Sequence, residues 1–210
     1  MNEACPPADA VRRSMGFLGL QETMALTQRQ VLIPDPGSVL VSPGVTLGRN
    51  VILWPNVILQ IPGDGRIIIG AGTILFPGTR IVAPHGSVAI GVGAEIGEEG
   101  GFTIKAETGD RIEIGDGARL LGGGSLTRSN RIGRGAQILG PIRCQDCILG
   151  DGGTYRDPEP DERGAVLKGS GVARRINLPK GRVIQAFGLF AEAEVRPQSY
   201  FHPKTGDEGD

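Results

Sequence analysis

The chain has two histidines, and they are the residues best suited to acid–base chemistry. Histidine is the usual proton acceptor near neutral pH, since its unperturbed pKa is about 6.5. His202 stands in the C-terminal tail. His85 stands in the phrase IVAPHGSV, where a step of nine residues replaces a hydrophobic spacing of six. Because such an irregular corner can project its side chain outward, we predict that His85 is the catalytic base.

Two cysteines, Cys144 and Cys147, form the phrase CQDC. This spacing serves redox or metal chemistry in other proteins. A zinc site would need two further ligands, and neither a second C-x-x-C phrase nor a neighbouring histidine is present. Cys144 also falls in phase with apolar Ile138, six residues earlier. We therefore expect a buried apolar role for this residue and no bound metal.

A run of three glycines, residues 122–124, precedes a polar stretch that could contact a ligand. Glycine lets a ligand or a neighbouring subunit approach the backbone closely. Four polar residues are therefore candidates for substrate binding, the last of them in a polar loop at 153–166: Ser125, Thr127, Asn130 and Tyr155. The alternative interpretation is that the glycines form only a tight corner.

A repeat with a period of six positions these residues. A branched aliphatic residue is repeatedly followed at once by glycine, as at Leu47, Ile69, Ile90, Ile96, Ile114 and Ile132. Aliphatic residues also recur every six positions in three runs, which extend from Val41 to Leu59, from Ile69 to Ile81 and from Ile114 to Cys144. A small or compact residue follows most of them four positions later. A fixed internal period identifies a repeat architecture.

The period predicts the fold. Six residues fit neither the helical period of about 3.6 nor the strand period of 2, but they fit a chain that turns a corner every six residues. Three such faces make one coil of about eighteen residues, with the aliphatic residues stacked inside and neighbouring coils about 4.8 Å apart. We expect the glycine after each aliphatic residue to supply backbone angles that the corner requires.

Composition agrees with such a coil and excludes several functions. Glycine accounts for 35 of 210 residues, and aromatic residues for only 4%, which suits many corners around a narrow interior. A net charge of −1 gives no general attraction to nucleic acid or to anionic membranes. Neither a membrane-spanning apolar run nor a signal peptide is visible. With an odd count of three cysteines, we expect a cytoplasmic protein with reduced thiols.

The chain divides into three predicted regions. Residues 1–30 are not repetitive and are expected to include a short helix. Residues 31–188 form the coiled domain, which two loops at 97–113 and 153–166 interrupt. Residues 189–210 form a cap and tail, with a short helix expected at LFAEAEV.

The phrases LGRNVI, IGAGTI, IGDGAR and IGRGAQ resemble the hexapeptide-repeat superfamily. The resemblance covers about residues 38–188 and implies an all-β, left-handed parallel β-helix. The handedness comes from the resemblance, because ordinary parallel crossovers run the other way. The resemblance also implies a homotrimer, with active sites in grooves between subunits where the side chain of His85 would project.

The last coil resembles the ending of hexapeptide acyltransferases, since Pro179, Gly181 and Val183 match its Pro-x-Gly-x-Val phrase. The glycine and proline that usually follow are replaced by Phe187, Gly188 and Leu189. In that family this end of the helix lies near the phosphates of coenzyme A. The resemblance therefore implies acetyl-CoA or another acyl-CoA as cofactor, with four cations as its candidate contacts: Arg174, Arg175, Lys180 and Arg182.

The opening phrase resembles the acetyltransferase domain of bifunctional N-acetylglucosamine-1-phosphate uridylyltransferases. The matching residues are Asp35, Pro36, Gly48, Pro55 and Asn56. The catalytic signature of that family, a histidine followed closely by Tyr-x-Gly-Asp, is absent here.

Three functions can be compared with these features of the sequence. The first is an acyl-CoA-dependent acyltransferase that transfers an acetyl group to an amine or hydroxyl of a sugar or nucleotide sugar, which the resemblance implies. The second is a non-catalytic trimeric protein with a binding or structural role. The third, a γ-type carbonic anhydrase, needs three histidine ligands for its metal, whereas this chain has two histidines in total.

Overall fold

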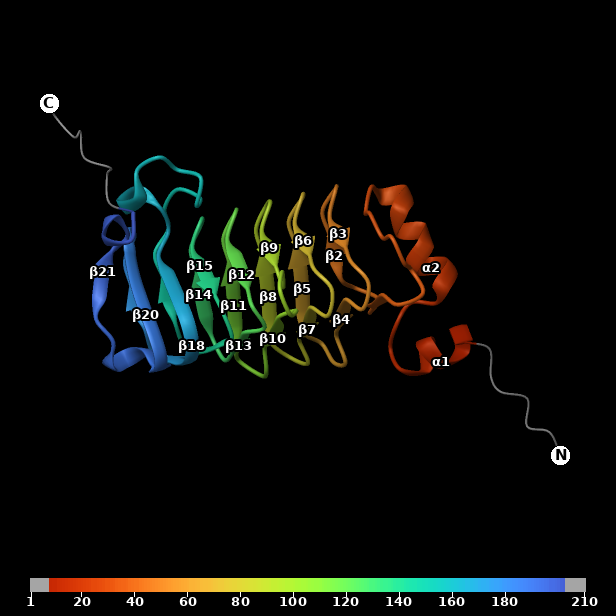
Figure 1. Cartoon of the computed structure of the whole chain (residues 1–210). Coiled ribbons are helices and arrows are strands. Elements are labelled where there is room, and N and C mark those ends of the chain that lie inside the picture. Colours follow the sequence, from red (N-terminus) through yellow and green to blue (C-terminus); the bar gives the residue numbers. More distant parts are fainter. Residues whose placement is uncertain (1–7, 203–210) are drawn as a thin grey trace, which may run out of the picture.

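The computed structural model, which describes residues 8–202, shows the chain wound into a three-sided prism (Figure 1). Each side is a parallel ladder in which equivalent strands of successive coils pair. The prism is a left-handed parallel β-helix, so the expected fold class is confirmed. Two helices and a 3-10 turn cover its N-terminal end: α1 (Ala8–Ser14), α2 (Leu20–Ala25) and η1 (Leu26–Arg29).

Each face takes one strand from each coil. The first face contains β1 (Leu40–Val41), β4 (Ile58–Gln60), β7 (Arg80–Val82), β10 (Thr103–Lys105), β13 (Ser125–Thr127) and β16 (Ile142–Gln145). The second face contains β2 (Thr46–Leu47), β5 (Arg66–Ile69), β8 (Ser87–Ile90), β11 (Arg111–Ile114), β14 (Asn130–Ile132), β17 (Ile148–Leu149) and β19 (Asn177–Leu178). The third face contains β3 (Ile52–Leu53), β6 (Ile74–Leu75), β9 (Glu95–Ile96), β12 (Arg119–Leu121) and β15 (Gln137–Leu139).

Two long strands bend from the third face onto the first and finish the coil. They are β18 (Val166–Arg174) and β20 (Arg182–Leu189), which pair in parallel along most of their length. A short strand, β21 (Val195–Pro197), then pairs antiparallel with β20. Three 3-10 turns complete the elements: η2 (Pro160–Glu162), η3 (Phe190–Glu192) and η4 (Gln198–Tyr200). In the phrase where a short helix was expected, the tail contains the 3-10 helix η3, and β21 begins at the last residue of that phrase.

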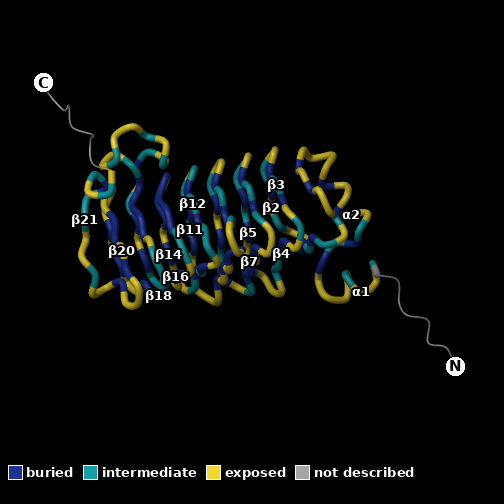
Figure 2. The backbone as a smooth tube through the Cα atoms, viewed as in Figure 1, coloured by how far each residue is buried: buried dark blue, intermediate teal, exposed yellow. Residues whose placement is uncertain are grey.

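The interior is a set of aliphatic stacks, as the repeat predicts. Ile114 pairs with Ile132, 18 residues later, and Leu120 pairs with Ile138 in the same way. These side chains are 0–3% exposed. Figure 2 shows that buried residues occur in every coil of the prism. Cys144 occupies the same kind of position, because it pairs with Leu126 and is fully buried.

The glycine that follows Ile96 has the left-handed backbone that was expected (Gly97, φ 93°), but the glycines that follow Leu47, Ile69, Ile90, Ile114 and Ile132 do not. Gly115 does not have a left-handed backbone. A Cβ on Gly115 would lie 2.4 Å from the backbone nitrogen of Arg134 in the next coil. This glycine therefore allows the close approach of neighbouring coils, whereas the left-handed angle falls two residues later, at Gly117 (φ 61°).

The interpretation of residues 97–113 as a loop that keeps one coil's length is wrong. This segment contains β10 and the start of β11, and Ile104 is a fully buried residue of the first face. Ile96 belongs to the third face and Ile114 to the second. Extra residues at both corners between them lengthen the path to the 18 residues of a full coil. The 18-residue separation of Ile96 and Ile114 therefore equals the length of one coil only by coincidence, because two corners carry insertions.

Candidate active-site edge of the prism

One edge of the prism carries most of the residues with chemical potential. We call it the first edge, and define it as the corner between the first and second faces. In three successive coils this corner is enlarged, at residues 61–65, 83–86 and 106–110. Because coils stack in register, these enlarged corners lie next to one another and form a ridge.

The ridge brings together an imidazole and a carboxylate. Nδ1 of His85 lies 2.6 Å from Oδ1 of Asp64, which belongs to the preceding coil. The side chain of His85 is 55% exposed and that of Asp64 is 87% exposed, so the pair faces solvent. The hydrogen bond with His85 lowers the pKa of Asp64 below its ordinary value.

The carboxylate fixes the proton on the ring. An ionised carboxylate only accepts hydrogen bonds, so Nδ1 of His85 must donate. In the neutral imidazole, Nε2 then keeps its lone pair and can accept a proton. This is the tautomer that a general base needs, and the negative charge of Asp64 would stabilise the imidazolium that forms.

The glycines on either side of Asp64 allow the corner that contains His85 to pack closely against them. A Cβ on Gly63 would lie 2.4 Å from the carbonyl oxygen of Pro84 and 2.7 Å from Cε1 of His85. A Cβ on Gly65 would lie 2.1 Å from the carbonyl oxygen of Ala83. The phrase PGDG therefore lets one corner rest directly on the next.

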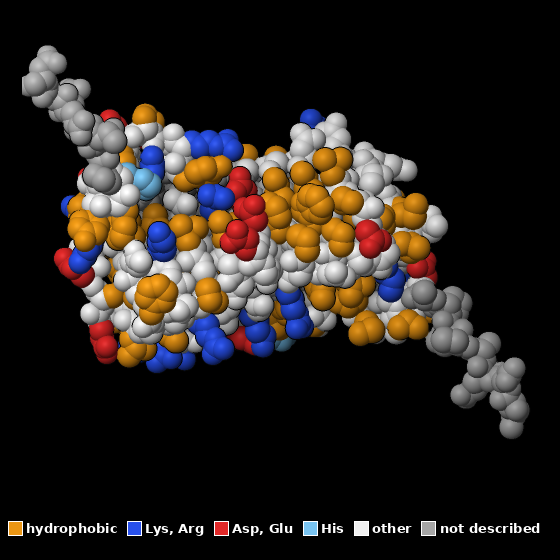
Figure 3. Space-filling view, in the orientation of Figure 1, with side chains coloured by type: hydrophobic (Ala, Val, Ile, Leu, Met, Phe, Trp, Pro, Cys, Tyr) orange, Lys and Arg blue, Asp and Glu red, His pale blue; other side chains and the backbone are white. Residues whose placement is uncertain are grey.

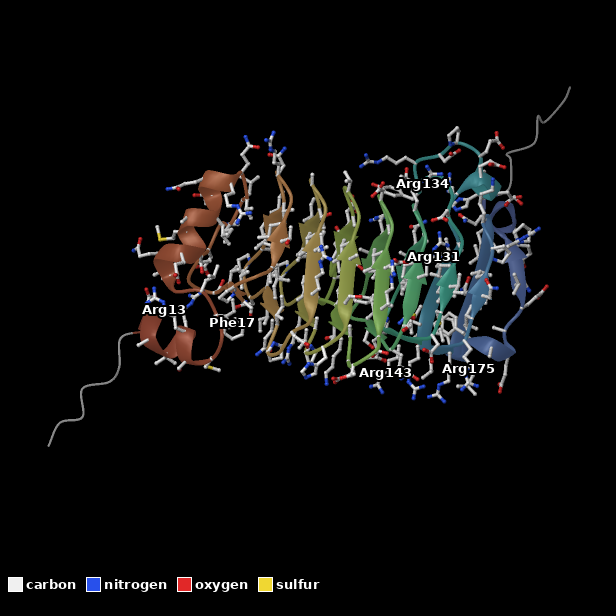
Figure 4. The ribbon with its side chains drawn as sticks, turned by 180° about the vertical axis from the view of Figure 1, so that it is seen from behind. Arg13, Phe17, Arg131, Arg134, Arg143 and Arg175 are labelled. Atoms are coloured by element: carbon white, nitrogen blue, oxygen red, sulfur yellow. The ribbon has the colours of Figure 1, made fainter. Side chains whose placement is uncertain are left out.

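Arginines gather toward the C-terminal end of the same edge. Figure 4 shows Arg143 and Arg175 along one border of the prism. Arg174 ends β18 and donates from Nε to Oε1 of Gln145 at 3.0 Å. Within residues 8–202, these three arginines have no carboxylate within ion-pair distance. Arg128, one coil earlier, is instead 3.5 Å from Asp146.

The four cations predicted to contact a cofactor are divided between two edges. Arg174 and Arg175 lie at the first edge. Lys180 follows β19, at the corner between the second and third faces, where its Nζ is 2.5 Å from Glu162. Arg182 begins β20 on the third face. The structure therefore does not bring the four cations together within one chain, and their contact with a cofactor stays a prediction.

The predicted substrate residues are also separated. Ser125 and Thr127 point outward from β13 on the first face, beside the first edge. Asn130 is 3% exposed, and its amide bonds to the backbone of Thr127, Arg128 and Cys147. It therefore closes a corner instead of facing a ligand.

Tyr155 lies elsewhere, in the loop that covers part of the third face. The guanidinium of Arg119 lies 4.1 Å from the centre of its ring, and Arg156 lies 5.1 Å from it. Both contacts are cation–π interactions. Tyr155 therefore does not share a site with Ser125 and Thr127 within one chain.

The two cysteines are structural. Both are fully buried, and the thiol of Cys147 contacts the carbonyl oxygen of Ala173 at 3.3 Å. A hydrogen bond with Cys147, together with burial, raises the pKa of Cys144 well above its ordinary value. Across residues 8–202, no group of three or more His, Cys, Asp or Glu side chains is placed to hold a metal ion.

Sequence reasoning missed Asp64 and Arg143. The signal for Asp64 was present, since PGDG and APHG are both insertions after the first-face strand of adjacent coils. Aligning coils by face would have placed the two phrases side by side. Arg143 could have been found from the regular register of residues 114–149, which puts it above Ser125 on the outer surface.

Comparison with known proteins agrees with this architecture. No known protein-family model matches the chain. The bifunctional protein GlmU of Carboxydothermus hydrogenoformans is 30% identical over 148 residues, which is 70% of this chain. The chain spans 29% of the length of that relative. The repeat, the coil and this alignment agree. The chain is a hexapeptide-repeat protein.

Solved structures that resemble this hexapeptide-repeat protein include two at low identity. A GDP-perosamine N-acetyl transferase from Caulobacter crescentus, in complex with CoA and GDP-perosamine, is 18% identical with a TM-score of 0.40; the match covers 84% of this chain and 64% of that one. LpxA from Acinetobacter baumannii is 15% identical with a TM-score of 0.34, over 85% and 77% of the two chains. In the described part of the chain, no helix is long and apolar enough to span a membrane.

Proposed function

We propose that this hexapeptide-repeat protein is an acyl-CoA-dependent acyltransferase. Its acceptor is an amine or a hydroxyl, and the sequence resemblance favours acetyl transfer to a sugar or nucleotide sugar. The observation that carries the proposal is the hydrogen bond between His85 and Asp64 on an exposed ridge. That pair is a proton acceptor with its tautomer fixed, which is what attack on a thioester requires.

The residues of the ridge would act as follows. The acyl-CoA supplies an acyl group as a thioester. Nε2 of His85 takes the proton of the acceptor as the acceptor nitrogen or oxygen bonds to the acyl carbon. Asp64 stabilises the resulting imidazolium. His85 then returns the proton to the sulfur as the carbon–sulfur bond breaks, so that the enzyme ends in its starting protonation state.

The first edge also offers a place for phosphates. Arg143, Arg174 and Arg175 present guanidinium groups that no carboxylate of the described residues neutralises. Guanidinium groups match the geometry of phosphate oxygens. Four strand spacings separate the corner of His85 from that of Arg175, which is about 19 Å along the edge. An extended, flexible cofactor suits that separation, with Ser125 and Thr127 between its two ends.

We also propose a homotrimer. The third face exposes apolar side chains over β3 and β6, which Figure 3 shows as a patch on the N-terminal half of the molecule. Leu32 is 53% exposed and Trp54 is 40% exposed, and Ile52, Ile74 and Phe76 lie beside them half-buried. Closed threefold symmetry would cover this patch in every copy. A monomer mass by light scattering at micromolar concentration would refute this assembly.

Calorimetric titration of acetyl-CoA tests the cofactor proposal. The Arg174→Ala/Arg175→Ala variant should bind acetyl-CoA more weakly than the wild type does. The matched control is Lys180→Ala/Arg182→Ala, which removes two cations from the other edge and should leave binding unchanged. Equal weakening in both variants would show that the arginines of the first edge have no specific role.

Variants of the ridge test the chemistry. Replacing His85 by Ala should lower turnover by about 10²–10⁴ while leaving cofactor affinity nearly intact, as expected for a general base. Asp64→Asn should lower turnover less, because the ring is exposed and can still adopt the reactive tautomer. If wild-type protein gives neither heat nor a thermal shift with millimolar acetyl-CoA, the alternative of a non-catalytic binding or structural protein replaces the acyltransferase.

A further inference from the structure

A cavity of about 260 Å³ lies on the third face at the C-terminal end of the prism. Its floor is formed by outward-facing residues of β12, β15, β18 and β20. Its roof is formed by the loop at residues 150–165 and by the tail at residues 198–202. We call it the cap cavity. It is on a different face from His85, and its interpretation is independent of the proposed acyl transfer.

Specific hydrogen bonds hold the roof in place. Nε2 of Gln198 donates to the carbonyl oxygen of Gly164 at 2.7 Å, and Gln198 is 3% exposed. The backbone nitrogen and the hydroxyl of Ser199 both bond to Asp161 at 2.9 Å. Nε of Arg163 donates to the carbonyl oxygen of Asp157 at 2.8 Å. The loop and the tail are thus joined, so the cavity has defined walls.

Positive charge surrounds the cavity. Arg119, Arg163 and Lys168 line it, and Nη1 of Arg163 lies 3.5 Å from Nε2 of His202. Arg119 is balanced by Glu95 at 2.8 Å and by Glu98 at 3.4 Å.

The other two cations of the cap cavity are not balanced. No carboxylate of residues 8–202 lies within ion-pair distance of Arg163 or Lys168. Nζ of Lys168 lies 5.9 Å from the centre of the Phe201 ring. Figure 3 shows Lys and Arg side chains beside apolar ones in this part of the molecule.

A buried amide completes the floor. Gln137 is 6% exposed and lines the cavity, yet its side chain makes no hydrogen bond with any residue that the structure describes. Among the described residues no fully buried side-chain nitrogen or oxygen lacks a partner, so the amide of Gln137 is open to the cavity and can bond to a ligand there. Leu139, Val166 and Val183 supply apolar wall around it.

We propose that the cap cavity binds a small organic anion, with a carboxylate or phosphate group on a compact apolar body. Arg163 and Lys168 would hold the anionic group, and the amide of Gln137 would donate to it. The apolar walls would cover the body of the ligand. The volume lies just below the range of about 300–1,000 Å³ that is typical of pockets for drug-sized ligands, so the ligand is smaller than those.

Calorimetric titration of the full chain with matched probes tests this proposal. Benzoate and phenyl phosphate carry the two anionic groups, and benzamide is the neutral analogue of benzoate. At least one of the two anions should bind, and should bind more weakly as salt concentration rises. The stronger of the two identifies the anionic group. Binding of benzamide as tight as that of both anions, or no binding of either anion, would overturn the proposal.

Variants locate the site. Lys168→Met should weaken binding of the preferred anion by about fivefold, because the lysine is partly solvated. Gln137→Glu should weaken it by at least about tenfold, because it adds a negative charge at the floor. Arg80→Met, which removes an exposed cation from the first face, is the matched control and should change nothing. If the control weakens binding as much as Lys168→Met, binding reflects overall charge and the cap cavity is not the site. Lys168 is at the surface, so Lys168→Met should fold. It therefore tests the site even if Gln137→Glu does not fold.

Discussion

The aliphatic stack of the third face gives a quantitative test of the fold. Ile138 pairs with Leu120 in the coil before it and with Leu167 in the coil after it. All three side chains are fully buried. Replacing Ile138 by Ala deletes three carbons from the middle of this stack. Ladder hydrogen bonds fix the coils on either side, so the walls cannot collapse into the cavity.

The expected loss is therefore large for one side chain. Ile→Ala substitutions in cores cost about 2–5 kcal/mol, and a cavity that cannot relax belongs in the upper half of that range. Urea unfolding monitored by circular dichroism would measure the loss. The matched control is Ile148→Ala, which removes the same atoms from an outward side chain that is 44% exposed. It should cost less than about 1 kcal/mol.

The location of the damage provides a second readout. Coils contact mainly their neighbours, so weakening should be local at first. Hydrogen exchange of Ile138→Ala should accelerate in β12, β15 and β18 before it accelerates in β3 and β6. If Ile138→Ala and Ile148→Ala lose equal stability, the inward and outward positions of the coil have been assigned wrongly.

Three further predictions follow from the geometry of single residues. Gly115→Ala should strongly lower the melting temperature, because the added Cβ would lie 2.4 Å from a backbone nitrogen of the next coil. Gly109→Ala is the control and should be milder. Its Cβ would meet nothing within 4 Å, so it carries only the cost of a left-handed backbone. Cys144 and Cys147 should resist thiol reagents in the folded protein, since both are fully buried; rapid labelling without denaturant would contradict the buried assignment. The pKa of Asp161 is lowered, chiefly by the hydrogen bond from the backbone of Ser199, so its contribution to stability is present above its unfolded pKa and is lost as pH falls through the folded pKa. Tail protection, measured by limited proteolysis, should therefore decrease on acidification in the wild type, and Asp161→Asn should show the weak protection already at neutral pH.

The sequence predicts the interior well because the interior is periodic. Residues such as Ile114, Ile132 and Ile138 occupy equivalent inward-facing positions. Each of them therefore supports the prediction that the others are buried. The period fails where insertions occur. Between Ile96 and Ile114, two enlarged corners imitate the length of a full coil, and only the paired register of β10 shows that a single face lies between them.

The candidate sites are less predictable for a related reason. Asp64 and His85 meet because two insertions of different length occupy the same edge, a relation that requires each coil to be aligned by face. The cap cavity combines residues as distant as Arg119 and His202, which no repeat relates. The sequence shows that Lys180 is charged, but not that it pairs with Glu162. Glu162 lies in the loop at 153–166, whose path the repeat does not determine.

Both ends of the prism are covered, and this affects whether separate molecules can join end to end. A β-helix that stopped at β20 would present a row of unpaired backbone groups, and its first coil would do the same at the other end. Two such ends from different molecules could join and propagate into a fibre. Here β21 occupies the outer side of β20 with the opposite strand direction, and α1 and α2 lie across the first coil (Figure 1). The short non-repetitive segments thus act as stops against polymerisation, which allows a long stack of identical edges to remain a discrete molecule.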